Sequence, residues 1–88
     1  MLLLFVASRT DNVAVGFCVS KKVGNSVVRN RVKRRMKEAF RLEIEKLKPG
    51  CRLVFIARPL LSEAAFADIQ TTMRYLLRTS GLYKEENR

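Results

Sequence analysis

The spacing of apolar residues predicts three strands. Residues 1–7 are rich in Leu, Phe and Val, and in residues 13–20 Val and Phe alternate with Ala, Gly, Cys and Ser. Residues 51–57 are apolar at both alternating positions, which is typical of a buried central strand. Because residues 8–12 contain Ser, Asp and Asn, which favour turns, a hairpin is the simplest connection between the first two strands.

A long amphipathic helix is predicted between the second and third strands. Asn25 is a plausible N-cap, and apolar residues then recur at helical spacing over roughly residues 27–48, until Pro49 and Gly50 end the pattern. Glu43 falls within the apolar arc of this helix, and the helical pattern gives no functional account of it.

A second helix is predicted near the end of the chain. Ser62 is its candidate cap, one apolar stripe follows, and Gly81 lies just beyond its end. Residues 84–88 are expected to form a solvated tail. The order strand, strand, helix, strand, helix predicts one α+β domain over residues 1–88, with helices packed against a single sheet.

The charge of the chain favours a polyanionic partner. It carries 18 Lys and Arg against 8 Asp and Glu, a net charge of +10. Residues 21–41 hold nine of the basic residues and one acid, Glu38, which gives 9 − 1 = +8 in that stretch. Nucleic acid and an anionic membrane surface both remain possible partners for such a field.

Basic and apolar residues separate on the predicted first helix. A solvated surface helix is the simpler interpretation, but such helices mix signs, whereas these basic residues repel one another. Arg29 lies in the first turn beside free backbone N–H groups, so it helps to form an anion-binding end. The polar side of the helix collects Asn30, Arg34, Lys37 and Arg41, with Arg31 and Arg35 nearby.

Neither cysteine has metal-ligand spacing, and the chain contains no His. Cys18 and Cys51 are therefore interpreted as reduced thiols packed like small apolar residues, which favours a cytoplasmic location. The longest apolar run, residues 1–7, is far shorter than the roughly 20 residues that cross a bilayer, and it lacks the basic leader of a signal peptide.

The stretch from residue 21 to residue 41 reads KKVGNSVVRNRVKRRMKEAFR and closely resembles the bacterial ribonuclease P protein component. The resemblance extends to residues 15–20, 53–58 and 81–84, so it covers nearly the whole chain. It implies a two-layer sandwich of the ribosomal protein S5 domain 2-like type. It also implies a left-handed strand-helix-strand crossover, an exception to the strong right-handed rule.

The resemblance implies an RNA-binding subunit of a ribonucleoprotein that removes the 5′ leader of precursor tRNA. The catalytic RNA and precursor tRNA are the implied partners, and divalent metal, Mg²⁺, is held at the active site of the RNA. The protein itself is expected to supply no catalytic residue and no metal ligand. The positions implied to contact the catalytic RNA are Lys21, Lys22, Arg29, Asn30, Arg31, Lys33, Arg34, Arg35, Lys37 and Arg41.

A second implied site is a cleft, floored by the sheet, that holds the single-stranded leader. Phe5, Cys18 and Ser20 match positions on that floor, although Phe5 is equally well explained as a core residue and Phe17 is better explained as one. An N-terminal helix and lead-in segment are expected ahead of Met1. Without them one cleft wall is lost and apolar sheet surface is uncovered, which leaves the oligomeric state open.

Three alternatives compete with this interpretation. An independent nuclease is disfavoured because the acids show no paired metal-binding motif. A DNA-binding or ribosomal protein remains open because phosphate attraction does not distinguish duplexes from folded RNA, and competition at matched salt separates them. A membrane-surface helix is the weakest alternative, because the apolar face lacks Trp and is needed to cover the sheet.

Overall fold

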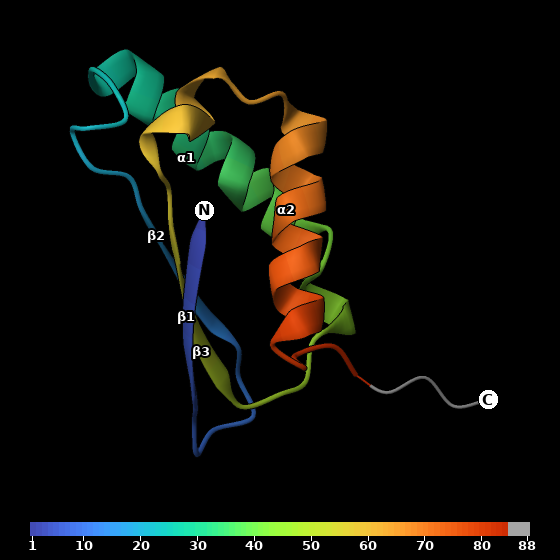
Figure 1. Cartoon of the computed structure of the whole chain (residues 1–88). Helices are drawn as coiled ribbons and strands as arrows, with labels where there is room; N and C mark the ends of the chain where they lie inside the picture. The colour runs from blue at the N-terminus through green and yellow to red at the C-terminus, as the bar shows by residue number, and fades with distance from the viewer. Residues whose placement is uncertain (85–88) are drawn as a thin grey trace.

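The computed structural model describes residues 1–84, in which both predicted kinds of layer are present. Figure 1 shows the strands in one layer and both α-helices on one side of it, which confirms the predicted two-layer α+β fold. The expected tail lies outside the described residues from position 85 onward. The elements are β1 (Leu2–Ala7), β2 (Ala14–Cys18), α1 (Ser26–Arg41), η1 (Ile44–Lys46), β3 (Cys51–Ile56), η2 (Pro59–Glu63) and α2 (Phe66–Thr79), where η marks a 3-10 turn.

The sheet has the order β1-β3-β2, so the predicted hairpin is wrong. β3 is antiparallel to β1 and parallel to β2. The segment after β1 wraps around the start of β3, where the Ser8 amide donates to the Gly50 carbonyl at 2.6 Å. Gly50 has a φ of 75°, and a Cβ there would lie 2.8 Å from the Thr10 carbonyl oxygen, so glycine is needed for this close approach.

The core lies between the sheet and the helices. Both helices bury most of the apolar stripe predicted for them, including Met36 on α1 and Met73 on α2. Ile44, predicted to continue the first stripe, lies beyond α1 and is 40% exposed. Phe17, Phe40 and Phe55 form an aromatic cluster with ring centroids 5.8 to 6.0 Å apart. Such pairs add stability beyond the burial of their area, and the cluster confirms Phe17 as a core residue.

α1 begins as predicted but ends early. The Asn25 side chain accepts from the Val28 amide at 3.0 Å and caps the first turn. The helix ends at Arg41, so its predicted extension to residue 48 is wrong, and residues 44–46 form η1 instead. Residues 46–48 instead pair with the C-terminal segment: the Lys48 amide donates to the Leu82 carbonyl and the Lys84 amide to the Lys46 carbonyl, each at 2.8 Å. This pairing requires extended chain, which a helix continued to residue 48 could not supply.

Glu43 is the buried centre of a polar cluster whose other members are partly exposed. It accepts from the Tyr83 hydroxyl at 2.8 Å and from Arg74 Nε at 3.0 Å, and Lys46 Nζ lies 3.8 Å away. Burial acts to raise the pKa of Glu43, but the hydrogen bonds from Tyr83 and Arg74 and the nearby positive charges outweigh it, so the pKa is lowered. Burial and the adjacent carboxylate raise the pKa of Tyr83.

α2 begins later than predicted and ends where predicted. Ser62 lies in η2, and the N-cap is Ala65, which has no side-chain acceptor, so the predicted Ser62 cap is wrong. At the other end Gly81 has a φ of 70°, and the Leu82 amide donates to the Leu77 carbonyl at 3.1 Å. This glycine C-cap satisfies carbonyls that the helix end leaves free.

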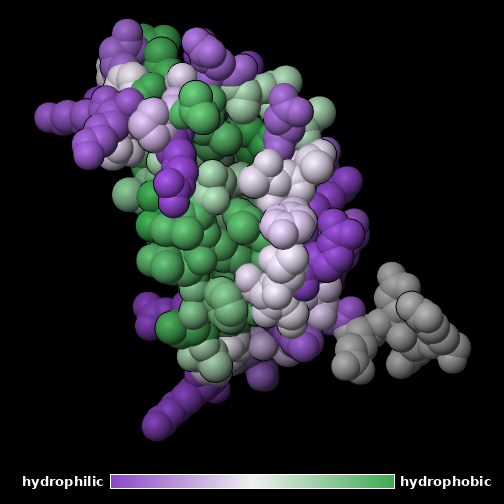
Figure 2. Space-filling view, in the orientation of Figure 1, coloured by the Kyte–Doolittle hydropathy of each residue, from purple (hydrophilic) through white to green (hydrophobic). Residues whose placement is uncertain are grey.

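The opposite face of the sheet is open. Leu4, Val6 and Val54 are 54%, 60% and 40% exposed, so the prediction that β3 is buried on both faces is wrong. Figure 2 shows apolar surface over β1, which lies in front of the other strands in this view. Both cysteines are free thiols, but only Cys51 is buried as predicted, and Cys18 is exposed. Within residues 1–84 no helix has the length and apolar character to span a membrane.

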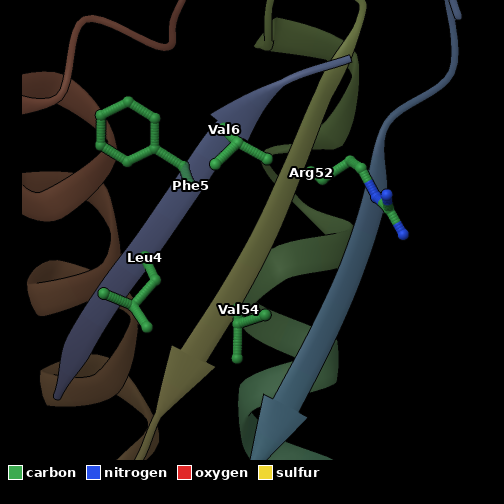
Figure 3. A pocket seen from close by; sticks show the side chains of 5 residues that line it. All are labelled: Leu4, Phe5, Val6, Arg52 and Val54. Atoms are coloured by element: carbon green, nitrogen blue, oxygen red, sulfur yellow. The ribbon is translucent and has the colours of Figure 1, made fainter.

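The crossover between the two parallel strands has the unusual hand that the resemblance implies. In Figure 3 the helices lie behind the sheet, β2 and β3 run downward, and the chain passes from β2 through α1 to β3 on its left. This is a left-handed β-α-β unit, whereas nearly all such units are right-handed.

Candidate nucleic-acid interface

One side of α1 presents a row of exposed polar and basic side chains. Asn30, Lys33, Arg34 and Lys37 are all exposed, and none of the three cations forms an ion pair within residues 1–84. At about 1.5 Å per residue the row from position 30 to position 37 is roughly 10 Å long. We call these four residues the basic ridge.

Two further basic residues of α1 differ from the ridge. Arg41 is exposed but donates from Nε to the Glu38 carboxylate at 3.1 Å, so part of its charge is compensated. Arg29 is half-buried, and its buried Nε has no hydrogen-bond partner among the described residues. No acidic residue lies in the first turn of α1, so the positive end of the helix dipole and Arg29 add together.

Arg31 and Arg35 turn toward the protein. Arg31 Nη2 donates to the Ser62 carbonyl at 3.3 Å, and Arg35 Nη1 donates to the Ala64 carbonyl at 3.0 Å. Both residues are half-buried. Sequence reasoning missed these contacts because the acceptors are backbone groups about 30 positions away, which no side-chain pattern reveals.

Lys21 and Lys22 lie in the turn between β2 and α1. The Val23 amide donates to the Ser20 carbonyl at 3.1 Å, and the Val23 side chain is buried in the core. This anchor leaves Ser20 and both lysines exposed at the entrance to α1. The structure therefore brings the two predicted lysines beside the predicted anion-binding end of the helix.

A hollow of about 270 Å³ lies on the open face of the sheet. Its lining comes from β1 and β3, and Figure 3 shows these side chains around it: Leu4, Phe5, Val6, Arg52 and Val54. Side chains of paired residues share a face of a sheet, so Cys18, opposite Ile56, lies on this open face.

Phe5 borders the hollow, but its side chain does not project from the open face. It is paired with the buried Leu53, so its side chain leaves β1 on the helix side, where it remains 46% exposed at the sheet edge. The structure therefore brings Cys18 and the exposed Ser20 to the same end of the molecule but separates Phe5 from them. Phe5 is also no core residue, because nearly half of it is exposed and it does not pack against the buried cluster.

Small side chains line the open face of β2. Ala14, Gly16 and Cys18 alternate with the core residues of the strand. A Cβ at Gly16 would meet only Val54 Cγ2, at 3.9 Å, which is an ordinary contact. Packing therefore does not require glycine here, although glycine weakens a strand interior. The alternation of small residues was visible in the sequence, but which face it occupied was not.

Among residues 1–84 no three His, Cys, Asp or Glu side chains come together as a metal site. The family model described as Ribonuclease P matches residues 1–81. The ribonuclease P protein component of Alkaliphilus metalliredigens is 45% identical over 82 residues, which are 93% of this chain and 74% of the relative. That of Clostridioides difficile is 42% identical over 83 residues, 93% of this chain and 73% of the relative.

Solved structures agree with these sequence matches. The RNase P protein of Staphylococcus aureus superposes with a TM-score of 0.83 at 25% identity, covering 93% of this chain and 75% of that one. The protein of Thermotoga maritima gives 0.78 at 28% identity, covering 88% and 74%. The hand of the crossover, the sequence of α1 and these matches lead to one conclusion: the chain belongs to the ribonuclease P protein component family.

Proposed function

We propose that this chain is the RNA-binding subunit of a ribonuclease P holoenzyme and that it contacts the catalytic RNA through the basic ridge. The observation that carries the proposal is the exposure of three cations on one helix face without an acidic partner in the described chain. Such a face is stabilised by an anionic partner, and phosphate is the anion that RNA supplies. Lys21, Lys22 and Arg29 extend the same surface past the start of α1.

The proposal assigns the chemistry of tRNA 5′ maturation to the RNA. In this scheme the RNA holds the Mg²⁺ ions that activate water, and the protein binds and orients the two RNAs. Electrostatic attraction of this kind accelerates association. In the proposed scheme the cations of the protein also replace part of the metal charge that would otherwise hold the two RNAs together. The proposed location is cytoplasmic, where precursor tRNA is made in bacteria.

We further propose that the 5′ leader lies on the open face of the sheet. Apolar side chains of β1 and β3 offer surface for unpaired bases, and Arg52 offers a cation for the backbone. The small side chains at Gly16 and Cys18 let a base approach the sheet closely, and Ser20 lies where β2 leads to the two lysines. In this arrangement the leader connects the apolar floor to the basic end of α1.

Gly16→Val tests the proposed function of this face. A holoenzyme of bacterial ribonuclease P RNA and this chain is expected to bind leader-bearing precursor tRNA more tightly than mature tRNA. The variant should remove at least about tenfold of that difference, because stacking of one base on a protein surface contributes roughly 1 to 3 kcal/mol. Its melting temperature should not fall, because Val favours strands and the added Cβ makes only an ordinary contact, 3.9 Å from Val54 Cγ2.

Ala7→Val is the matched control, because it enlarges an exposed strand residue on the other face of the sheet. This control should keep the full preference for leader-bearing tRNA. The leader proposal is contradicted if Gly16→Val retains the preference, or if both variants lose it equally.

A further inference from the structure

We infer that Arg31 and Arg35 are positioning residues: they clamp the segment that joins η2 to α2 onto the RNA-binding helix and do not themselves contact phosphate. The inference refines the proposed function, because it divides the basic residues of α1 into an outer set that binds RNA and an inner pair that holds the fold. Only the statement that the inner pair does not contact phosphate rests on the proposed function; the clamp itself does not.

The geometry of the pair is that of a clamp. The two arginines are four positions apart, so they lie one turn apart on the same side of α1. Their acceptors, the carbonyls of Ser62 and Ala64, are two positions apart on the facing segment. Arg34 lies between them in sequence yet is exposed. Adjacent residues of one helix therefore point in different directions, two inward and one outward.

The facing segment needs these donors. No main-chain hydrogen bond to the Ser62 or Ala64 carbonyl occurs within residues 1–84. A partly buried carbonyl without a partner costs free energy, and a guanidinium supplies a charge-assisted donor. Other backbone groups of the segment are paired within it: the Ala64 amide donates to the Leu61 carbonyl at 3.2 Å.

The clamp also anchors the start of α2. The N-cap residue, Ala65, has no side chain that can accept a hydrogen bond, so α2 begins without the usual capping contact. Arg35 binds the carbonyl directly before this residue. α1 packs against both η2 and α2. The two arginines hold α1 to the segment between η2 and α2, close to the first residue of α2.

Their orientation separates the pair from an RNA phosphate. Arg31 Nε is buried, without a hydrogen-bond partner in the described chain, although its Nη2 is engaged. A phosphate on the ridge would meet Lys33, Arg34 and Lys37 first, because these are exposed. Contact with the inner pair would require the segment to move away.

The test compares Arg35→Gln and Arg31→Gln with the matched control Arg34→Gln, which removes the same charge from the same helix. Hydrogen exchange reports the clamp through the amides of Ala64 and Ile69, which donate within this region. Both inner variants should speed exchange about tenfold, since a hydrogen bond from a charged group is worth roughly 1.5 kcal/mol or more. Arg34→Gln should leave these rates unchanged, and Arg35→Lys, which keeps a donor, should restore part of the protection.

The same proteins are then titrated with bacterial ribonuclease P RNA over a range of salt concentrations. Arg34→Gln should lower the slope of log affinity against log salt by about 0.7 to 0.9, the value of one phosphate contact, and the inner variants should leave it unchanged. An inner variant that lowers the slope as much as Arg34→Gln, or leaves exchange unaltered, overturns the inference. If the unaltered chain does not bind this RNA, the proposed function fails, and the exchange rates still decide on the clamp.

Discussion

Glu43→Ala is expected to destabilise the protein by about 2 kcal/mol and to lower its melting temperature by roughly 10 °C. The carboxylate is 1% exposed and joins three parts of the chain: the end of α1, Arg74 on α2 and Tyr83 near the C-terminus. Removing it leaves the Tyr83 hydroxyl and Arg74 without this acceptor. For a small domain this is a large share of the total stability, and thermal unfolding followed by circular dichroism measures it.

The same residue sets a dependence on pH. Because the pKa of Glu43 is lowered in the folded protein, its charged form stabilises the fold at neutral pH, and this contribution is lost as the pH falls through the lowered pKa. Glu43→Gln should therefore be less stable than the unaltered chain at pH 7 and should lose less on acidification below about pH 4. Glu45→Gln, an exposed neighbour, is the control. Equal melting temperatures for Glu43→Ala and the unaltered chain would contradict the claim that the Glu43 carboxylate stabilises the fold.

The double variant Arg34→Ala/Lys37→Ala is expected to weaken binding to the catalytic RNA on the order of 30-fold at low salt, from about 1 kcal/mol per lost contact. The slope of log affinity against log salt should fall by roughly 1.5, because each phosphate contact releases bound counterions. Both side chains are exposed and neither forms an ion pair within residues 1–84, so the fold should not change. Filter binding over a range of salt concentrations gives both quantities.

The control for this variant is Arg78→Ala/Lys84→Ala. It removes the same net charge from exposed positions on α2 and the segment after it, so it separates a local contact from the overall field of a +10 protein. The control should change the slope little. An equal effect from both double variants would mean that the ridge is not the RNA face and that attraction is spread over the surface.

The sequence predicted the elements well but not how the strands pair. The helical pattern of α1 is strong because its apolar residues all lie on the side that packs against the core, and Asn25 caps its first turn. Strand order was missed because β1 and β2 are consecutive, while β3, the neighbour with which both pair, begins 33 positions after β2 ends. Local propensity contains no information about such a long-range pairing.

The ends of the helices and the division of the basic residues needed tertiary contacts. Nothing near residue 46 in the sequence shows that residues 46–48 will pair with residues 82–84, so helical spacing extended α1 too far. Likewise ten polar positions were grouped as one RNA-contacting set, and the structure shows two of them bonded to backbone carbonyls. The role of each in RNA binding stays a prediction for the titrations to decide.

The most direct measurement is cleavage of precursor tRNA by a bacterial ribonuclease P RNA at low magnesium, with and without this chain. The proposed function predicts that the RNA alone cuts poorly under these conditions and that the chain restores cutting at the mature 5′ end. It also predicts that the chain without the RNA does not cut. Failure to restore cutting, together with failure to bind the RNA at low salt, would contradict the assignment of this chain as the protein subunit of the enzyme.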